Sequence, residues 1–185
     1  MLLLDDDVLV PSDLLERLRR HERPVVSALY LDRRPPFRPL AFASMDWGYV
    51  PVDLNALAPD AVVRVRTLGC GALLVERAVL EAVAEPWFPE DGRHDPDLGF
   101  ADNLMLAGIG IEVDLGARCG HILQPADPGC GLTLAIWPEV DERGWRWRII
   151  PTAEDGAEMP RELVIEWKDP SRPEPFRQLV SADAP

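Results

Sequence analysis

The chain opens with an apolar run that ends in three aspartates: Leu2-Leu3-Leu4, then Asp5-Asp6-Asp7, then Val8-Leu9-Val10. A short apolar run of this kind predicts a buried strand. Alternate residues of a strand point to the same side, so Asp5 and Asp7 can present two carboxylates together. Closely spaced carboxylates repel each other unless protons or a cation neutralise them. The motif therefore predicts either a cation site at a strand end or a strand that runs out into solvent.

Composition narrows the classes of protein that the chain can belong to. Its 185 residues carry a formal net charge of −13, which argues against binding nucleic acid or anionic lipid. No apolar stretch is long enough to span a membrane, and the first residues lack the basic segment of a signal peptide. Three cysteines are too few for a disulfide framework. We therefore expect a cytoplasmic protein with no nucleic-acid partner and no membrane span.

Predicted strands and helices alternate along the first two thirds of the chain. A Pro-Ser-Asp sequence at residues 11–13 is typical of a helix start, and Arg23-Pro24 of a helix end. The pattern predicts an α/β fold with strands over 2–10, 24–30, 61–66, 68–75 and 110–114 and further helices over 76–84 and 97–107. Residues 31–60, rich in Pro and Arg, are predicted to form a long surface excursion.

The pattern changes after Pro125. Residues 131–137, 144–150 and 162–167 alternate apolar and polar side chains between Gly and Pro turns, which predicts a small antiparallel β meander. The tail from Asp169 is Pro-rich and is expected to fray. We therefore divide the chain into a catalytic region, residues 1–124, and an accessory region, residues 125–185.

Several segments of the first region resemble glycosyltransferase family 2 and related enzymes of the GT-A fold. Leu2–Val8, with the helix and strand that follow it, resembles the DxD segment of that family. Leu68–Val75 and its following helix are similar to the acceptor-side strand and helix. Asp97–Gly108 is similar to the helix that carries the family's acidic motif. Ile111–Asp114 and Gly120-His121-Ile122 are similar to the strand and histidine that close the site. These segments follow one another along the chain in the same order as in the family.

The resemblance implies a partial GT-A sheet with flanking helices and a metal-dependent, inverting transfer of a sugar from a nucleotide-sugar to an unknown acceptor. The cofactor implied is Mn²⁺ or Mg²⁺, bound through Asp5, Asp6 and Asp7. Asp5, Asp7 and His121 are the implied metal ligands, although a histidine satisfied by core hydrogen bonds is the alternative for His121. Without the family resemblance, that alternative is favoured.

Inversion needs a base that takes the proton of the acceptor hydroxyl. By position that base is Asp97, with Asp95 as substitute, because Pro96 stands where the family usually has an acid. Simple helix capping is the alternative for Asp97. Substrate contacts are assigned to Gly69, Cys70, Gly71 and Trp47, with Cys70 interpreted as a small core residue rather than a nucleophile.

The sequence departs from the family before its first strand. In the GT-A fold the donor nucleotide binds to elements that precede the DxD segment, and here only residues 1–4 precede it. A late start site, a second polypeptide or a decayed remnant would each explain this, so we expect another chain or self-association to complete the sheet. Two functions compete with transfer: a non-catalytic remnant or interaction module, and a zinc site formed by Cys119, His121 and Cys130.

Overall fold

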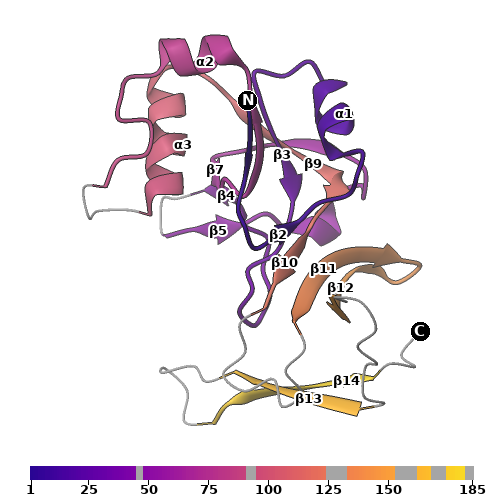
Figure 1. Ribbon diagram of the computed structural model, residues 1–185. Helices are drawn as coiled ribbons and strands as arrows, with labels where there is room; N and C mark the ends of the chain where they lie inside the picture. Colours follow the sequence, from indigo (N-terminus) through magenta and orange to yellow (C-terminus); the bar gives the residue numbers. More distant parts are fainter. Residues whose placement is uncertain (45–47, 91–94, 124–132, 153–161, 168–173, 182–185) are drawn as a thin grey trace.

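The computed structural model describes residues 1–44, 48–90, 95–123, 133–152, 162–167 and 174–181 (Figure 1). The fold is mixed α/β, as predicted. Its largest sheet has five strands in the order β1-β8-β3-β9-β6. These strands are β1 (Leu2–Leu4), β8 (Ala72–Val75), β3 (Val25–Leu29), β9 (Ile111–Arg118) and β6 (Val62–Val65). Only the β3–β9 pair is parallel among the four pairs of this sheet.

The central strand β3 is buried along its whole length because helices cover both faces of the sheet. Val25 and Leu29 point to the face that packs on α2 (Arg77–Ala82) and α3 (Pro96–Leu106). Val26 and Ala28 point to the opposite face, where α1 (Leu14–Arg19) buries Leu14 and Leu18. Figure 1 shows α1 on one side of the sheet and α2 with α3 on the other. The predicted helices over 76–84 and 97–107 are thus confirmed, with small shifts of their ends.

The first predicted strand is wrong in one respect, because it is broken at the aspartates. Val8 N–H donates to the carbonyl of Asp5, which closes a turn over the acidic residues. The turn lets the chain leave the first sheet, so β1 and β2 (Val8–Leu9) belong to different sheets. The second sheet has the order β12-β11-β10-β2, with β10 (Gly120–Ile122), β11 (Leu134–Asp141) and β12 (Gly144–Pro151).

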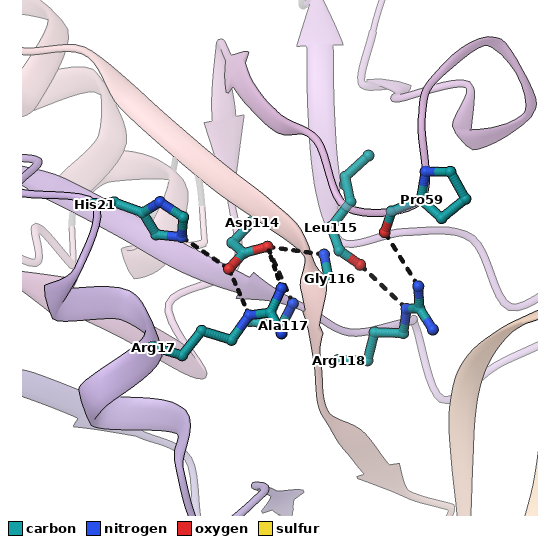
Figure 2. Close-up of polar contacts among 8 residues, drawn as sticks. All are labelled: Arg17, His21, Pro59, Asp114, Leu115, Gly116, Ala117 and Arg118. Atoms are coloured by element: carbon teal, nitrogen blue, oxygen red, sulfur yellow. Dashed lines mark hydrogen bonds and ion pairs between the residues drawn. The ribbon is translucent and has the colours of Figure 1, made fainter.

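Strand β9 passes from the first sheet toward the second through a bulge. Ala28 pairs with Asp114 but Leu29 pairs with Arg118, so residues 115–117 are extra on β9. The buried carboxylate of Asp114 accepts hydrogen bonds from Gly116 N (2.8 Å) and Ala117 N (3.1 Å) and so holds the bulge closed (Figure 2). Beyond it, Cys119 N donates to Leu29 O at 2.8 Å, and the chain continues into β10.

The segment predicted as a surface excursion contains regular structure, and that prediction is corrected. It holds β4 (Ala41–Ser44), β5 (Val50–Pro51) and the short 3-10 helix η1 (Leu54–Ala56). Strands β5 and β4 form a three-stranded sheet with β7 (Thr67–Leu68). The predicted strand over 68–75 is consequently divided between two sheets, since β7 and β8 lie on either side of the Gly69–Gly71 break.

The C-terminal strands do not form one meander, because β11 and β12 join β10 and β2 in the second sheet. That sheet therefore combines strands from both sides of residue 124. Strand β13 (Glu162–Trp167) pairs instead with β14 (Phe176–Ser181), which lies in the tail predicted to fray. Pairing satisfies the backbone N–H and C=O groups that an isolated strand would leave open. In the described part of the chain, no helix is both long and apolar enough to cross a membrane.

Candidate functional site

The side chains of Asp7 and His121 meet because β2 and β10 are paired. The register places His121 opposite Val8, directly after Asp7. Ile122 N donates to the backbone carbonyl of Asp7 at 2.8 Å, which fixes the aspartate beside the histidine. As a result, His121 Nε2 lies 3.5 Å from Asp7 Oδ2. Residues more than a hundred positions apart in sequence are thereby brought to one site.

The orientation of the His121 ring is fixed from its other nitrogen. Nδ1 lies 2.7 Å from the carbonyl oxygen of Leu31. A carbonyl only accepts, so Nδ1 carries the proton and donates it. Nε2 therefore faces Asp7 as the nitrogen available to a cation. Metal-binding histidines commonly donate their second ring nitrogen to a backbone carbonyl in this way, so the arrangement of His121 and Asp7 fits a metal site.

Asp5 lies at the same end of the sheet and contacts the Gly-Cys-Gly segment. Its backbone N–H donates to Gly71 O at 3.1 Å, and a Cβ atom on Gly71 would come within 2.7 Å of Asp5 Oδ2. Partial desolvation of Asp5, followed by the nearby charges of Asp97 and Asp7, raises the pKa of its carboxyl, which His121 lowers in part. The shift indicates that negative charge at this site is only partly compensated.

Asp97 reaches the same site from the first turn of α3. Its Oδ2 accepts a hydrogen bond from Cys70 N at 2.8 Å. Burial raises the pKa of Asp97, and the hydrogen bond from Cys70 N–H offsets part of that rise. A carboxylate with a raised pKa is a stronger base than an exposed one. The capping role falls to Asp95 instead, which is the N-cap of α3 and accepts from Asp97 N at 3.2 Å.

Tyr30 contacts both the Gly-Cys-Gly segment and His121, although no sequence motif selects it. Its hydroxyl oxygen accepts a hydrogen bond from Gly71 N at 2.9 Å, and its ring packs edge-on to His121 with 5.5 Å between centroids. A Cβ on Gly69 would lie 2.4 Å from the Tyr30 hydroxyl. The two glycines around Cys70 were the available signal, because glycine inside a strand pattern often marks a close approach.

Arg33 is the second residue that the sequence did not indicate. Its Nη1 forms an ion pair with Asp7 Oδ2, the same oxygen that His121 faces. Arg33 follows Leu31, whose carbonyl orients His121. A single loop after β3 therefore supplies both a cation for Asp7 and the acceptor for His121.

The other predicted site residues have different surroundings. Asp6 is exposed at the turn, and Trp47 lies outside the described residues. Burial raises the pKa of the Cys70 thiol well above its usual value, as expected for a core cysteine rather than a nucleophile. Cys119 is fully buried, with its pKa raised to about 12 by burial, and Cys130 lies outside the described residues.

Asp7 and His121 are in direct contact, but Asp5 lies against Gly71 rather than beside them. Within the described ranges, no group of three or more His, Cys, Asp or Glu side chains is arranged to hold a metal ion. Two residues, Asp7 and His121, are therefore placed to ligate the same ion, while Asp5 lies against Gly71. This set of oxygen and imidazole donors suits Mn²⁺ better than Mg²⁺.

Comparisons with known proteins add a likeness in fold. No protein-family model matches the chain, and no curated protein matches it in sequence. Among solved structures the chain is similar to A197 from STIV, a viral protein, with a TM-score of 0.53 and 15% sequence identity. The match covers 86% of this chain and 69% of that one. At this identity the likeness concerns the fold alone.

Proposed function

We propose that this chain carries the metal-binding and acceptor-side part of an inverting glycosyltransferase, which transfers a sugar from a nucleotide-sugar to an acceptor hydroxyl. One observation supports the proposal above others. Asp7 Oδ2 lies 3.5 Å from His121 Nε2, and the charges of Asp97, Asp7 and His121, which come from distant segments, all act on the Asp5 carboxyl where β1 ends. Pairs of carboxylates with raised pKa values concentrate at functional sites. The strands and helix that carry the family resemblance surround this cluster.

In this proposal Asp7 and His121 hold a divalent ion, with Asp5 at its side. The ion would act as a Lewis acid that stabilises the charge of the departing nucleoside diphosphate. Asp97 then takes the proton from the acceptor hydroxyl while the hydroxyl oxygen bonds to the anomeric carbon and the bond from that carbon to the diphosphate breaks. The hydrogen bond from Cys70 N to Asp97 Oδ2 holds the carboxylate in one orientation.

Completion of the sheet is part of the same proposal. In the described sheet β1 pairs only with β8, and Leu4 on β1 is 47% exposed. An exposed strand edge is a template for pairing with further chain. We expect a second polypeptide, or a second copy of this one, to pair with β1 and contribute to donor binding. Sedimentation at increasing protein concentration would show association, and a monomer at all concentrations would contradict this part.

The test of the proposed function combines binding with activity. Mn²⁺ together with a nucleoside diphosphate should raise the melting temperature more than either alone. With a panel of nucleotide-sugars, release of the diphosphate should fall about 100-fold or more in Asp97→Asn, because the base is lost. Asp95→Asn is the matched control, since it changes a neighbouring carboxylate that caps α3.

The result separates the candidates. Equal loss of activity in Asp95→Asn and Asp97→Asn, or full activity of Asp97→Asn, would contradict the assigned base. No thermal response to Mn²⁺ and nucleotides would favour the non-catalytic interaction module. Stabilisation by zinc alone would favour the zinc site, which has no supporting cluster among the described residues.

A further inference from the structure

The contact between a neutral His121 ring and Asp7 is favourable only with a positive charge nearby. Nδ1 of His121 donates to Leu31 O, so in the neutral ring the lone pair of Nε2 faces the Asp7 carboxylate at 3.5 Å. Two acceptors facing each other repel, and a cation that touches both relieves the repulsion. In this structure the guanidinium of Arg33 supplies a positive charge on the Asp7 side, because it pairs with the same Asp7 oxygen that His121 faces.

Arg33 is held in place by a compact loop. Leu31 bridges to Pro39, and Asp32 N donates to Arg38 O at 2.7 Å. The same loop carries the Leu31 carbonyl, so the position of Arg33 is tied to the element that orients His121. The Arg33 and Asp7 side chains are 34% and 22% exposed, which leaves the pair accessible to an ion from solvent.

We propose that Arg33 is a tethered cation that occupies Asp7 in place of a divalent ion, so that the ion must displace the Arg33 guanidinium to bind. The inference rests on the proposed function in one respect, namely that Asp7 binds a divalent cation. It follows from the sharing of a single oxygen, since Arg33 and an ion bound between Asp7 and His121 would both need Oδ2. Arg33 then sets the ion concentration at which the site fills.

The test measures Mn²⁺ binding directly, without any nucleotide or sugar. Free Mn²⁺ is followed by its electron paramagnetic resonance signal during titration of the full chain. Arg33→Gln removes the competing charge, and we expect it to bind Mn²⁺ about fivefold more tightly than wild type, as for loss of a partly shielded ion pair.

The matched control is Arg34→Gln. It removes the same charge from the neighbouring residue of the loop, whose 80% exposed side chain lies 3.9 Å from Asp32 instead. General electrostatic attraction of Mn²⁺ to the acidic chain would change equally in both variants. We expect Arg34→Gln to stay within about twofold of wild type, because exposed charges are largely screened. Equal tightening in both variants would overturn the inference.

Two further variants keep the result decisive. Asp7→Asn combined with Arg33→Gln should lose the tightening, since the shared oxygen no longer carries charge. Arg33→Lys, which keeps the charge without the guanidinium fork, should lie between wild type and Arg33→Gln, and it serves as the test if Arg33→Gln does not fold.

Failure of this inference and failure of the proposed function have different signatures. An unchanged or weaker Mn²⁺ affinity in Arg33→Gln, or no Mn²⁺ binding in any variant, would overturn the competition. Tighter Mn²⁺ binding by Arg33→Gln together with no response to nucleotides would support the competition and contradict the transferase.

Discussion

Two groups of acidic side chains, Asp114 within β9 and Asp5 after β1 with Asp97 on α3, differ in how their charge is compensated. Asp114 on β9 is fully buried and accepts from Arg17 Nε, from His21 Nε2 and from two backbone N–H groups (Figure 2). Burial alone would raise the pKa of Asp114, but the hydrogen bonds from Arg17, His21 and Gly116 outweigh it and lower the pKa.

At Asp5 and Asp97 the effects that raise the pKa outweigh those that lower it. Desolvation raises the pKa of each carboxyl and nearby carboxylates add to the rise. The charge of His121 at Asp5 and the hydrogen bonds from Cys70 to Asp97 do not offset it. The first group stabilises the fold by closing the β9 bulge. The second group costs stability when ionised, which is typical of a site that binds a cation or moves a proton. Acidic residues alone therefore do not mark a candidate site, whereas carboxyls whose pKa is raised, such as those of Asp5 and Asp97, do.

The largest effect is expected from Asp114→Asn. The substitution removes the charge that pairs with Arg17 and His21 inside the sheet, and we expect a loss of about 3 kcal/mol in the free energy of unfolding, measured with urea. Asp102→Asn is the control, because its pair with Arg66 is partly exposed and should contribute less than about 1 kcal/mol. Similar losses of unfolding free energy in both variants would mean that the buried contacts of Asp114 stabilise the fold no more than the partly exposed pair of Asp102 and Arg66.

A smaller loss is expected from Gly71→Ala. The added Cβ would lie 2.7 Å from Asp5 Oδ2 and 3.0 Å from the Tyr30 hydroxyl, so both side chains must shift, at a cost of about 1–3 kcal/mol. The shift should also weaken Mn²⁺ binding in a titration. Gly108→Ala has open space but a φ of +73°, and should cost about 1 kcal/mol without changing Mn²⁺ affinity. Unchanged Mn²⁺ binding in Gly71→Ala would argue against Asp5 as part of the site.

Asp97→Asn should leave stability unchanged or raise it, by no more than about 1 kcal/mol. The amide oxygen still accepts from Cys70 N, while the repulsion with Asp5 is removed. Urea unfolding at neutral pH provides the measurement. A clear loss of stability would mean that Asp97 is a structural residue like Asp114.

The pH dependence should have opposite signs at the two groups. The pKa of Asp114 is lowered in the folded chain, so its contribution is complete above the unfolded value near 3.8 and is lost as pH falls through the folded pKa. Asp5 and Asp97 have raised pKa values, so the folded state binds more protons and stability falls as pH rises from 3.8 through their folded pKa.

Unfolding free energies of wild type, Asp114→Asn and Asp97→Asn across acidic pH would test these signs. Relative to wild type, Asp114→Asn should lose its disadvantage at the lowest pH, and Asp97→Asn should improve as pH rises. Parallel curves for all three proteins would contradict the proposed difference between the groups.

Much of the fold followed from local patterns. Periodicity and end signals predict the buried strand β3, the helix α3 with acidic residues at its start and Gly108 past its end, and the antiparallel strands β11 and β12. The errors fell where strands change partners. Periodicity predicts that a segment is a strand, but it does not predict which sheet the strand joins. It therefore predicts one strand where β1 and β2, or β7 and β8, are two.

The candidate site shows the same limit. Asp5, Asp7, Asp97 and His121 were selected by motif and resemblance, whereas Tyr30 and Arg33 were not, because an isolated tyrosine or arginine carries no signal of its own. The Gly-Cys-Gly segment indicates a close approach, but only the pairing of β3 with β8 shows that the hydroxyl of Tyr30, directly after β3, is the group that approaches.

Local sequence patterns predict most helices and strands of the five-stranded sheet and show which carboxylates are available, since backbone periodicity and side-chain chemistry are local properties. The tertiary structure alone decided which carboxylates have compensating charges, because compensation depends on distances between segments that only strand pairing brings together. Asp114 on β9 meets Arg17 of α1 and His21 after it, whereas the charge of Asp97 acts on Asp5, and nothing in the local sequence distinguishes the two.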